Sequence, residues 1–73
     1  MPRRSEPKLM NRIKDLRSAD ANLTQQALAD AVGVTRQTII ALEAGGYVPS
    51  LALALRLANV FNTTVEQLFW LKE

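Results

Sequence analysis

The side chains best suited to specific recognition are two neighbours, Arg36 and Gln37, followed by the small apolar residue Ala41. An Arg guanidinium can donate two parallel hydrogen bonds to guanine O6 and N7, and a Gln amide can bond adenine N6 and N7. A small apolar side chain can lie against a thymine methyl. On one exposed helix face, this pattern is suited to contacting base edges in the major groove of DNA. The alternative for Arg36 and Gln37 taken alone is an ordinary exposed helix start.

A helix over about 36–44 would position these residues. Thr35 precedes it as an N-cap, and two glycines follow it. Ile39 and Leu42 fall on one side of this helix and predict its buried face. The opposite side carries polar or small side chains, namely Arg36, Gln37, Ala41 and Ala44, with Ile40 at its margin.

Another helix is predicted directly before it, over about 25–32, with Thr24 as its N-cap. Leu28 and Val32 are four residues apart and give it an apolar face. Gly33 follows at the point where a helix end commonly needs a residue with positive φ. The two helices are therefore expected to flank a sharp turn.

The spacing within this pair matches a helix-turn-helix. Counting Gln25 as the first position, the small Ala29 falls at five, Gly33 at nine, and the apolar Ile39 and Leu42 at fifteen and eighteen. With the segment LTQQALADAVGVTRQTIIALEAGGYVPSLALALRLANVF, nearly the whole chain resembles the phage-repressor-type family, also called Cro-like or Xre-like. The resemblance implies a lambda-repressor-like DNA-binding domain, with 36–44 as its recognition helix.

The resemblance assigns a role to each matching residue. The base-reading positions fall on Arg36, Gln37 and Ala41, while Gln25 would bond a DNA phosphate and brace the recognition helix. Further phosphate contacts are expected from hydroxyl groups at Thr24, Thr35, Thr38 and Tyr47. Capping alone is the alternative for Thr35, and packing of the ring is the alternative for Tyr47.

The resemblance also implies a structural ion pair between Arg17, late in the first helix, and Glu43, late in the recognition helix. This pair would lock the recognition helix to the scaffold, the alternative being two solvent-exposed charges. Ala44 and Gly46 occupy positions where relatives often carry Asn and a basic residue. Two side-chain phosphate contacts are therefore missing, and basic residues near the N-terminus are candidates to replace them.

The remaining pattern predicts three more helices, and thus an all-α, compact five-helix bundle. The first helix is expected from Lys8, because Leu9, Ile13 and Leu16 recur at helical spacing. Ser50 caps a helix over 51–61, whose inner face is predicted as Leu51, Ala54, Leu55, Ala58 and Phe61. Thr64 and Gln67 match a capping box before a short helix over 65–71.

The sequence predicts two parts, a flexible basic arm over 1–7 and a DNA-binding domain over 8–73. The net charge is only +2, yet six of the nine basic residues lie within the first seventeen positions. The chain contains no Cys and no His, which excludes thiolate and imidazole metal sites. We expect no metal, cofactor or small-molecule ligand. No signal peptide or membrane-spanning run is visible, so a cytoplasmic, nucleoid-associated protein is expected.

A homodimer on a pseudo-palindromic operator is expected, with half-sites about 34–36 Å apart. The C-terminal segment holds more apolar residues than one helix face can bury. The predicted dimer interface consists of Leu53, Val60, Phe69, Trp70 and Leu71. Packing of Trp70 on its own core is the alternative.

The predicted function is sequence-specific double-stranded DNA binding by a prokaryotic or phage transcriptional regulator acting as a repressor. The alternative is an antitoxin-type or other protein-interaction component with the same fold. An enzyme is not expected, because the seven acidic residues are scattered and no nucleophile–base pair can be assembled.

Overall fold

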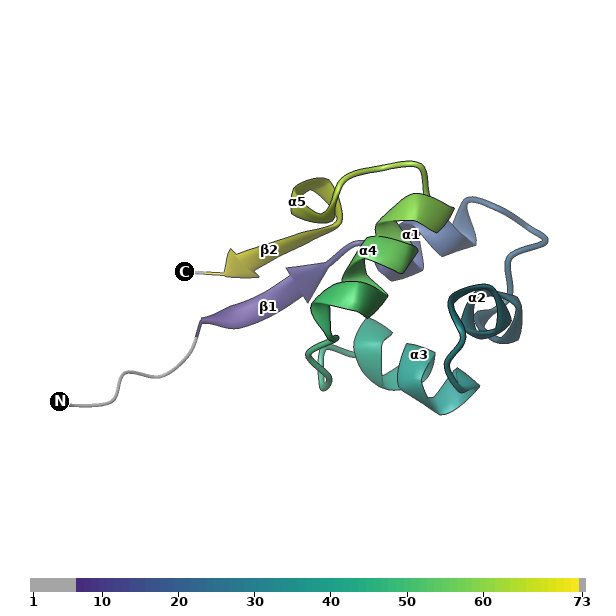
Figure 1. Ribbon diagram of the computed structural model, residues 1–73, viewed down its shortest axis with the longest axis horizontal. Coiled ribbons are helices and arrows are strands. Elements are labelled where there is room, and N and C mark those ends of the chain that lie inside the picture. The colour runs from purple at the N-terminus through teal and green to yellow at the C-terminus, as the bar shows by residue number, and fades with distance from the viewer. Residues whose placement is uncertain (1–6, 73) are drawn as a thin grey trace, which may run out of the picture.

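The computed structural model describes residues 7–72, which form five helices and two short strands (Figure 1). Strands β1 and β2 lie at one end of the molecule and α2 at the other (Figure 1). In chain order the elements are β1 (Lys8–Asn11), α1 (Ile13–Ser18), α2 (Gln25–Val32), α3 (Arg36–Glu43), α4 (Leu51–Val60), α5 (Val65–Leu68) and β2 (Phe69–Lys72).

Hydroxyl side chains begin four of the helices. Thr24, Thr35, Ser50 and Thr64 each accept a hydrogen bond from the backbone N–H three residues later. Each such cap stabilises a helix by about 0.5–2 kcal/mol relative to Ala. The predicted capping box is also present, since Gln67 bonds back to the Thr64 backbone. These local signals set the start of every helix after the first.

The all-α prediction was incomplete, because both ends of the described chain are strands. Strands β1 and β2 pair antiparallel, with Leu9 opposite Leu71 and Met10 opposite Trp70. The helix predicted from Lys8 begins only at Ile13, where the Asn11 side chain accepts from the Ile13 N–H at 3.0 Å. An Asn that bonds the following backbone in this way favours a helix start over a helix interior.

The C-terminal helix predicted over 65–71 was also too long. Helix α5 ends at Leu68, because Phe69 is extended with φ −124° and ψ 146°. The Arg12 N–H donates to the Leu68 carbonyl at 3.1 Å, so the chain between β1 and α1 is joined to the end of α5. Pairing between the two distant ends of the chain replaces the helix that local periodicity predicted.

The predicted inner face of α4 was rotated from the observed one. Leu53 and Leu57 are 2% and 0% exposed, whereas Leu51 and Leu55 are 70% and 55% exposed. The helix reads LALALRLANV and is apolar on most sides, so spacing alone does not decide which face is buried. Twelve residues form the core: Ile13, Leu28, Ala29, Val32, Ile39, Leu42, Leu53, Ala54, Leu57, Ala58, Leu68 and Phe69.

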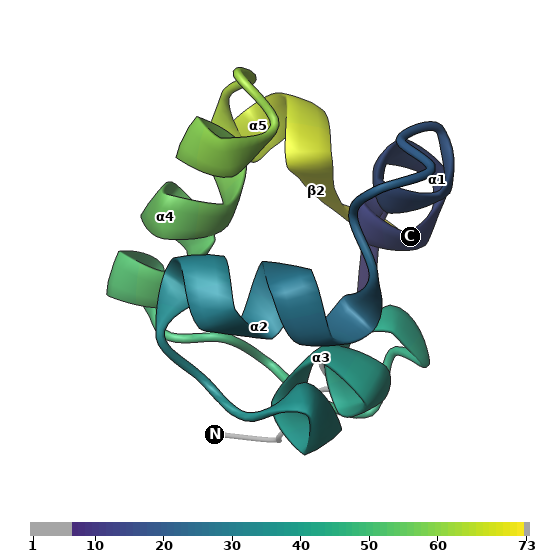
Figure 2. The same cartoon turned by 90° about the vertical axis from the view of Figure 1, so that its right-hand side faces the viewer.

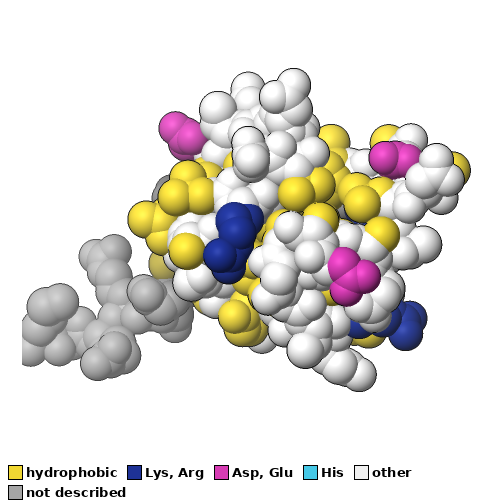
Figure 3. Space-filling model, turned by 45° about the vertical axis from the view of Figure 1, so that its right-hand side comes forward, with side chains coloured by type: hydrophobic (Ala, Val, Ile, Leu, Met, Phe, Trp, Pro, Cys, Tyr) yellow, Lys and Arg dark blue, Asp and Glu magenta, His cyan; other side chains and the backbone are white. Residues whose placement is uncertain are grey.

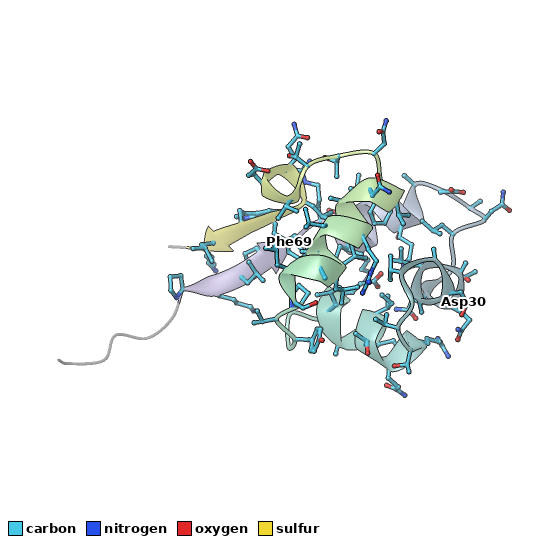
Figure 4. The ribbon with its side chains drawn as sticks, in the orientation of Figure 1. Asp30 and Phe69 are labelled. Atoms are coloured by element: carbon cyan, nitrogen blue, oxygen red, sulfur yellow. The ribbon has the colours of Figure 1, made fainter. Side chains whose placement is uncertain are left out.

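Two residues predicted for the dimer interface therefore lie inside the chain's own core. Leu53 packs there from α4, and Phe69 is only 7% exposed, among the side chains between β2 and the helices (Figure 4). The predicted arm over 1–7 lies outside the described residues except for Pro7. No helix in the described range 7–72 is both long and apolar enough to cross a bilayer.

Candidate nucleic-acid interface

Helices α2 and α3 form the predicted helix-turn-helix, with α2 lying across α3 (Figure 2). Gly33 ends α2 with φ 76°, the left-handed conformation expected there. The Val34 N–H then donates to the Ala29 carbonyl at 3.0 Å and fixes the turn. Ala29 is fully buried, and its small side chain permits close approach of the two helices. Local turn chemistry and one small residue thus set the orientation of α3.

The outer face of α3 carries the three predicted base-reading residues. Arg36 and Gln37 are exposed in the first turn, and Ala41 is partly exposed one turn later. Ile39 and Leu42 are fully buried beneath them. Ile40 is 36% exposed and adds an apolar side chain at the margin of this face. The face therefore offers bidentate polar groups at one end and small or apolar groups beyond them.

The predicted phosphate-contacting hydroxyls serve first as helix caps. The Oγ1 of Thr24 accepts from the Ala27 N–H at 3.0 Å, and Thr35 Oγ1 accepts from the Thr38 N–H at 3.3 Å. The Oγ1 atoms of Thr35 and Thr38 are 3.1 Å apart. A hydroxyl that accepts a backbone hydrogen bond retains its own hydrogen for donation. Tyr47 is 41% exposed beyond the end of α3, so its ring is only partly covered.

Arg17 and Glu43 form an ion pair that joins α1 to α3. Arg17 Nε donates to Glu43 Oε2 at 2.6 Å, and Nη2 donates to Oε1 at 3.2 Å. The side chains are 16% and 5% exposed, so the pair is largely shielded from water. The hydrogen bond to Glu43 raises the pKa of Arg17 above its usual value.

Gln25 extends this ion pair into a network of three side chains. Its Nε2 donates to Glu43 Oε1 at 3.1 Å, and Arg17 Nη1 also donates to the Leu23 carbonyl at 3.4 Å. The amide that begins α2 is therefore fixed to the end of α3. An amide nitrogen has two hydrogens, so Gln25 can brace α3 and still donate to an outside acceptor.

An open polar pocket surrounds the exposed side of this network. It is lined by two arginines and by residues at the start of α2, namely Arg17, Thr24, Gln25, Gln26 and Arg36. Guanidinium groups and helix N-terminal N–H groups are the donors that bind phosphate. The sequence did not predict that Arg17 and Arg36 line one pocket, because nineteen positions and a helix separate them. Within residues 7–72 there is no cluster of His, Cys, Asp or Glu that could hold a metal ion.

Comparison with known proteins agrees with this geometry. The family model described as Helix-turn-helix matches residues 13–68. The chain is 48% identical to an uncharacterized HTH-type transcriptional regulator, YgzD, of Bacillus subtilis, over 89% of this chain and 97% of that protein. It is 51% identical to an uncharacterized HTH-type transcriptional regulator of Archaeoglobus fulgidus, over 84% of each chain. The chain therefore belongs to the Xre/Cro-like helix-turn-helix family, a family of small DNA-binding regulators and not of enzymes.

Proposed function

We propose that this protein binds specific sequences in double-stranded DNA as a prokaryotic or phage transcriptional repressor, with α3 in the major groove. The observation that carries the proposal is the exposed first turn of α3, where Arg36 and Gln37 project beside the pocket at the start of α2. In this arrangement Arg36 and Gln37 bond base edges, and Ala41 contacts a thymine methyl. Occupying an operator in this way blocks polymerase.

Side chains at the starts of α2 and α3 contact the phosphate backbone. Gln25 donates its free amide hydrogen to a phosphate, and the capping hydroxyl of Thr24 donates its own. The Oγ1 atoms of Thr35 and Thr38 share one hydrogen bond, so one of these two hydroxyls keeps a hydrogen for a phosphate. Tyr47 adds a hydroxyl donor beyond α3. These contacts fix the position of α3 on the duplex without distinguishing one base pair from another.

Selection from random duplex DNA, followed by sequencing, tests this assignment. We expect an enriched two-fold motif from the wild type. Arg36→Ala and Gln37→Ala should each relax preference at one position per half-site, costing about 1–3 kcal/mol in specific affinity. Lys14→Ala is the control, because its exposed side chain lies on α1 and does not line the pocket at the start of α2. Failure to enrich any motif, or equal effects of all three variants, would refute sequence-specific recognition by α3.

We also propose that the protein acts as a homodimer, since one recognition helix contacts only a few base pairs. Of the residues predicted for the interface, Val60, Trp70 and Leu71 are 38%, 44% and 52% exposed. The Arg12 guanidinium lies over the Trp70 ring, 5.7 Å from its centroid, and so covers part of it.

A more exposed apolar patch lies at the start of α4. Val48, Leu51 and Leu55 are 75%, 70% and 55% exposed, and a groove beside them runs between α4 and α5. Figure 3 shows hydrophobic side chains gathered in contiguous patches on one face of the molecule. Such patches commonly mark protein contacts. We therefore centre the two-fold interface on this patch.

Analytical ultracentrifugation distinguishes the two surfaces. Leu51→Lys with Leu55→Lys should shift the wild-type dimer to monomer, and Leu71→Lys should leave it dimeric. If Leu71→Lys dissociates the dimer and the variant with Leu51→Lys and Leu55→Lys does not, the interface lies on β2. A wild type that stays monomeric at high concentration, with and without operator DNA, would exclude the dimer.

A further inference from the structure

Lys8 lies beside the end of α3, although 35 positions separate it from Glu43 in the sequence. Strand β1 and the segment from Glu43 to Gly45 line one small surface pocket. A Cβ placed on Gly45 would lie 3.5 Å from Lys8 Cε and 3.8 Å from Lys8 Nζ. Lys8 is exposed, and within residues 7–72 the one ion pair present is that of Arg17 with Glu43. The exposed Lys8 ammonium group therefore lies beside this loop.

The C-terminal end of α3 carries a partial negative charge, which disfavours a phosphate beside it. The helix dipole places about half a negative charge at a helix C-terminus. Glu43 contributes a carboxylate there, which the Arg17 guanidinium balances. The loop that follows, Ala44-Gly45-Gly46-Tyr47-Val48, has no charged side chain. Lys8 is thus the positive group that offsets the remaining negative potential at this end of α3.

The length of α3 places its two ends near opposite walls of a major groove. Eight residues of helix extend about 12 Å, and the major groove of B-DNA is about 12 Å wide. Arg36 and the pocket at the start of α2 are placed to contact the phosphate backbone beside the first turn of α3. Lys8 is positioned to serve the wall beside the last turn.

We propose that Lys8 contacts a DNA phosphate beside the C-terminal end of α3, an inference that rests on the proposed DNA-binding function. The contact comes from a strand outside the helix-turn-helix. It positions the recognition helix and carries no base preference. The strand pairing between β1 and β2 holds the Lys8 backbone in place for this role.

Salt-dependent binding to the selected operator tests the proposal. Each phosphate neutralised contributes about −0.9 to the slope of log Kobs against log salt concentration. Lys8→Gln should make the slope shallower by about 0.9 per protomer, or about 1.8 for the dimer, with about 60-fold weaker binding at 0.1 M salt than the wild type if the two agree at 1 M. The selected base motif should not change.

Lys72→Gln is the matched control. Lys72 pairs directly opposite Lys8 on β2, so its loss removes the same charge from the same sheet. Lys72 does not line the pocket that Lys8 shares with Gly45. The control should retain the wild-type slope, and circular dichroism should show that both variants keep the wild-type fold.

Moving the charge to the loop provides a rescue. Gly46 does not need positive φ, and a Cβ there would meet the Ala41 carbonyl oxygen at an ordinary 3.9 Å. Gly46→Lys in the Lys8→Gln background should restore the slope.

Two results would refute the Lys8 contact and leave the proposed function intact, provided that the wild type binds the operator. One is an equal salt slope for Lys8→Gln and Lys72→Gln. The other is a salt slope that Gly46→Lys does not restore in the Lys8→Gln background. No duplex binding by the wild type would refute the proposed function and the Lys8 contact with it.

Discussion

The ion pair between Arg17 and Glu43 should determine much of the stability of the DNA-binding conformation. Glu43→Ala removes three side-chain hydrogen bonds at once, two from Arg17 and one from Gln25. The variant also leaves the Arg17 guanidinium with only the 3.4 Å bond to the Leu23 carbonyl. The side-chain hydrogen bonds from α1 and α2 to Glu43 at the end of α3 are then lost.

The expected loss follows from how far the pair is shielded. Exposed ion pairs contribute about 0–1 kcal/mol, whereas removing one partner of a buried pair costs about 3–5 kcal/mol. Glu43 is nearly buried at 5% exposure, but Arg17 at 16% can recover some hydration. We therefore expect the free energy of unfolding to fall by about 2–3 kcal/mol, which for a domain of this size lowers the Tm by ~10–20 °C.

Thermal and urea unfolding, followed by circular dichroism, measure this loss. Asp30→Ala is the control, because its carboxylate accepts one exposed hydrogen bond from Gln26 and should change stability by less than about 0.5 kcal/mol. A double-mutant cycle with Arg17→Ala should give a coupling energy above about 1 kcal/mol. Equal Tm values for Glu43→Ala and Asp30→Ala, or a coupling energy near zero, would show that the pair does not stabilise the fold.

Three further substitutions test the packing beneath the interface. Gly33→Ala should lower the free energy of unfolding by about 1–2 kcal/mol in chemical denaturation, because an L residue is strained at φ 76°. No atom lies within 4 Å of the added Cβ, so the loss comes from the backbone alone. Gly46→Ala is the control and should be nearly neutral, because Gly46 does not have positive φ. Leu57→Ala should cost about 2–5 kcal/mol, since Leu57 is 0% exposed, whereas Leu55→Ala, at 55% exposure, should cost under about 1 kcal/mol. Ala29→Leu overpacks the crossing of α2 and α3 and should lower both stability, by about 1–3 kcal/mol, and operator affinity in fluorescence anisotropy.

Local chemistry explains why the helix-turn-helix was predictable from sequence. A capping hydroxyl, a glycine with positive φ and a buried pair such as Ile39 and Leu42 act within a few residues of one another. Their spacing therefore carries most of the information needed to place α2 and α3. The exposed first turn of α3, with Arg36 and Gln37, follows directly from that placement.

The two ends of the chain were not predictable from such local signals. Leu9 satisfies helical spacing with Ile13, yet its observed partner is Leu71, 62 residues away. The buried face of α4 has a similar cause. Both Leu51 and Leu53 begin an acceptable apolar face, and only packing against α2 and α5 selects Leu53. Long-range pairing and packing decide between alternatives that periodicity leaves equal.

The same long-range contacts join the candidate interface to the scaffold. Asn11 at the end of β1 donates to the Leu42 carbonyl at 3.1 Å, and Arg17 from α1 holds Glu43 one residue later. Two elements outside the helix-turn-helix, β1 and α1, thus form hydrogen bonds with consecutive residues at the end of α3. Gln25 in α2 donates to the same Glu43 carboxylate as Arg17. Because all of these contacts lie near the C-terminal end of α3, its first turn remains free to present Arg36 and Gln37. A change in β1 should therefore alter how α3 is oriented on DNA before it alters which bases the first turn prefers.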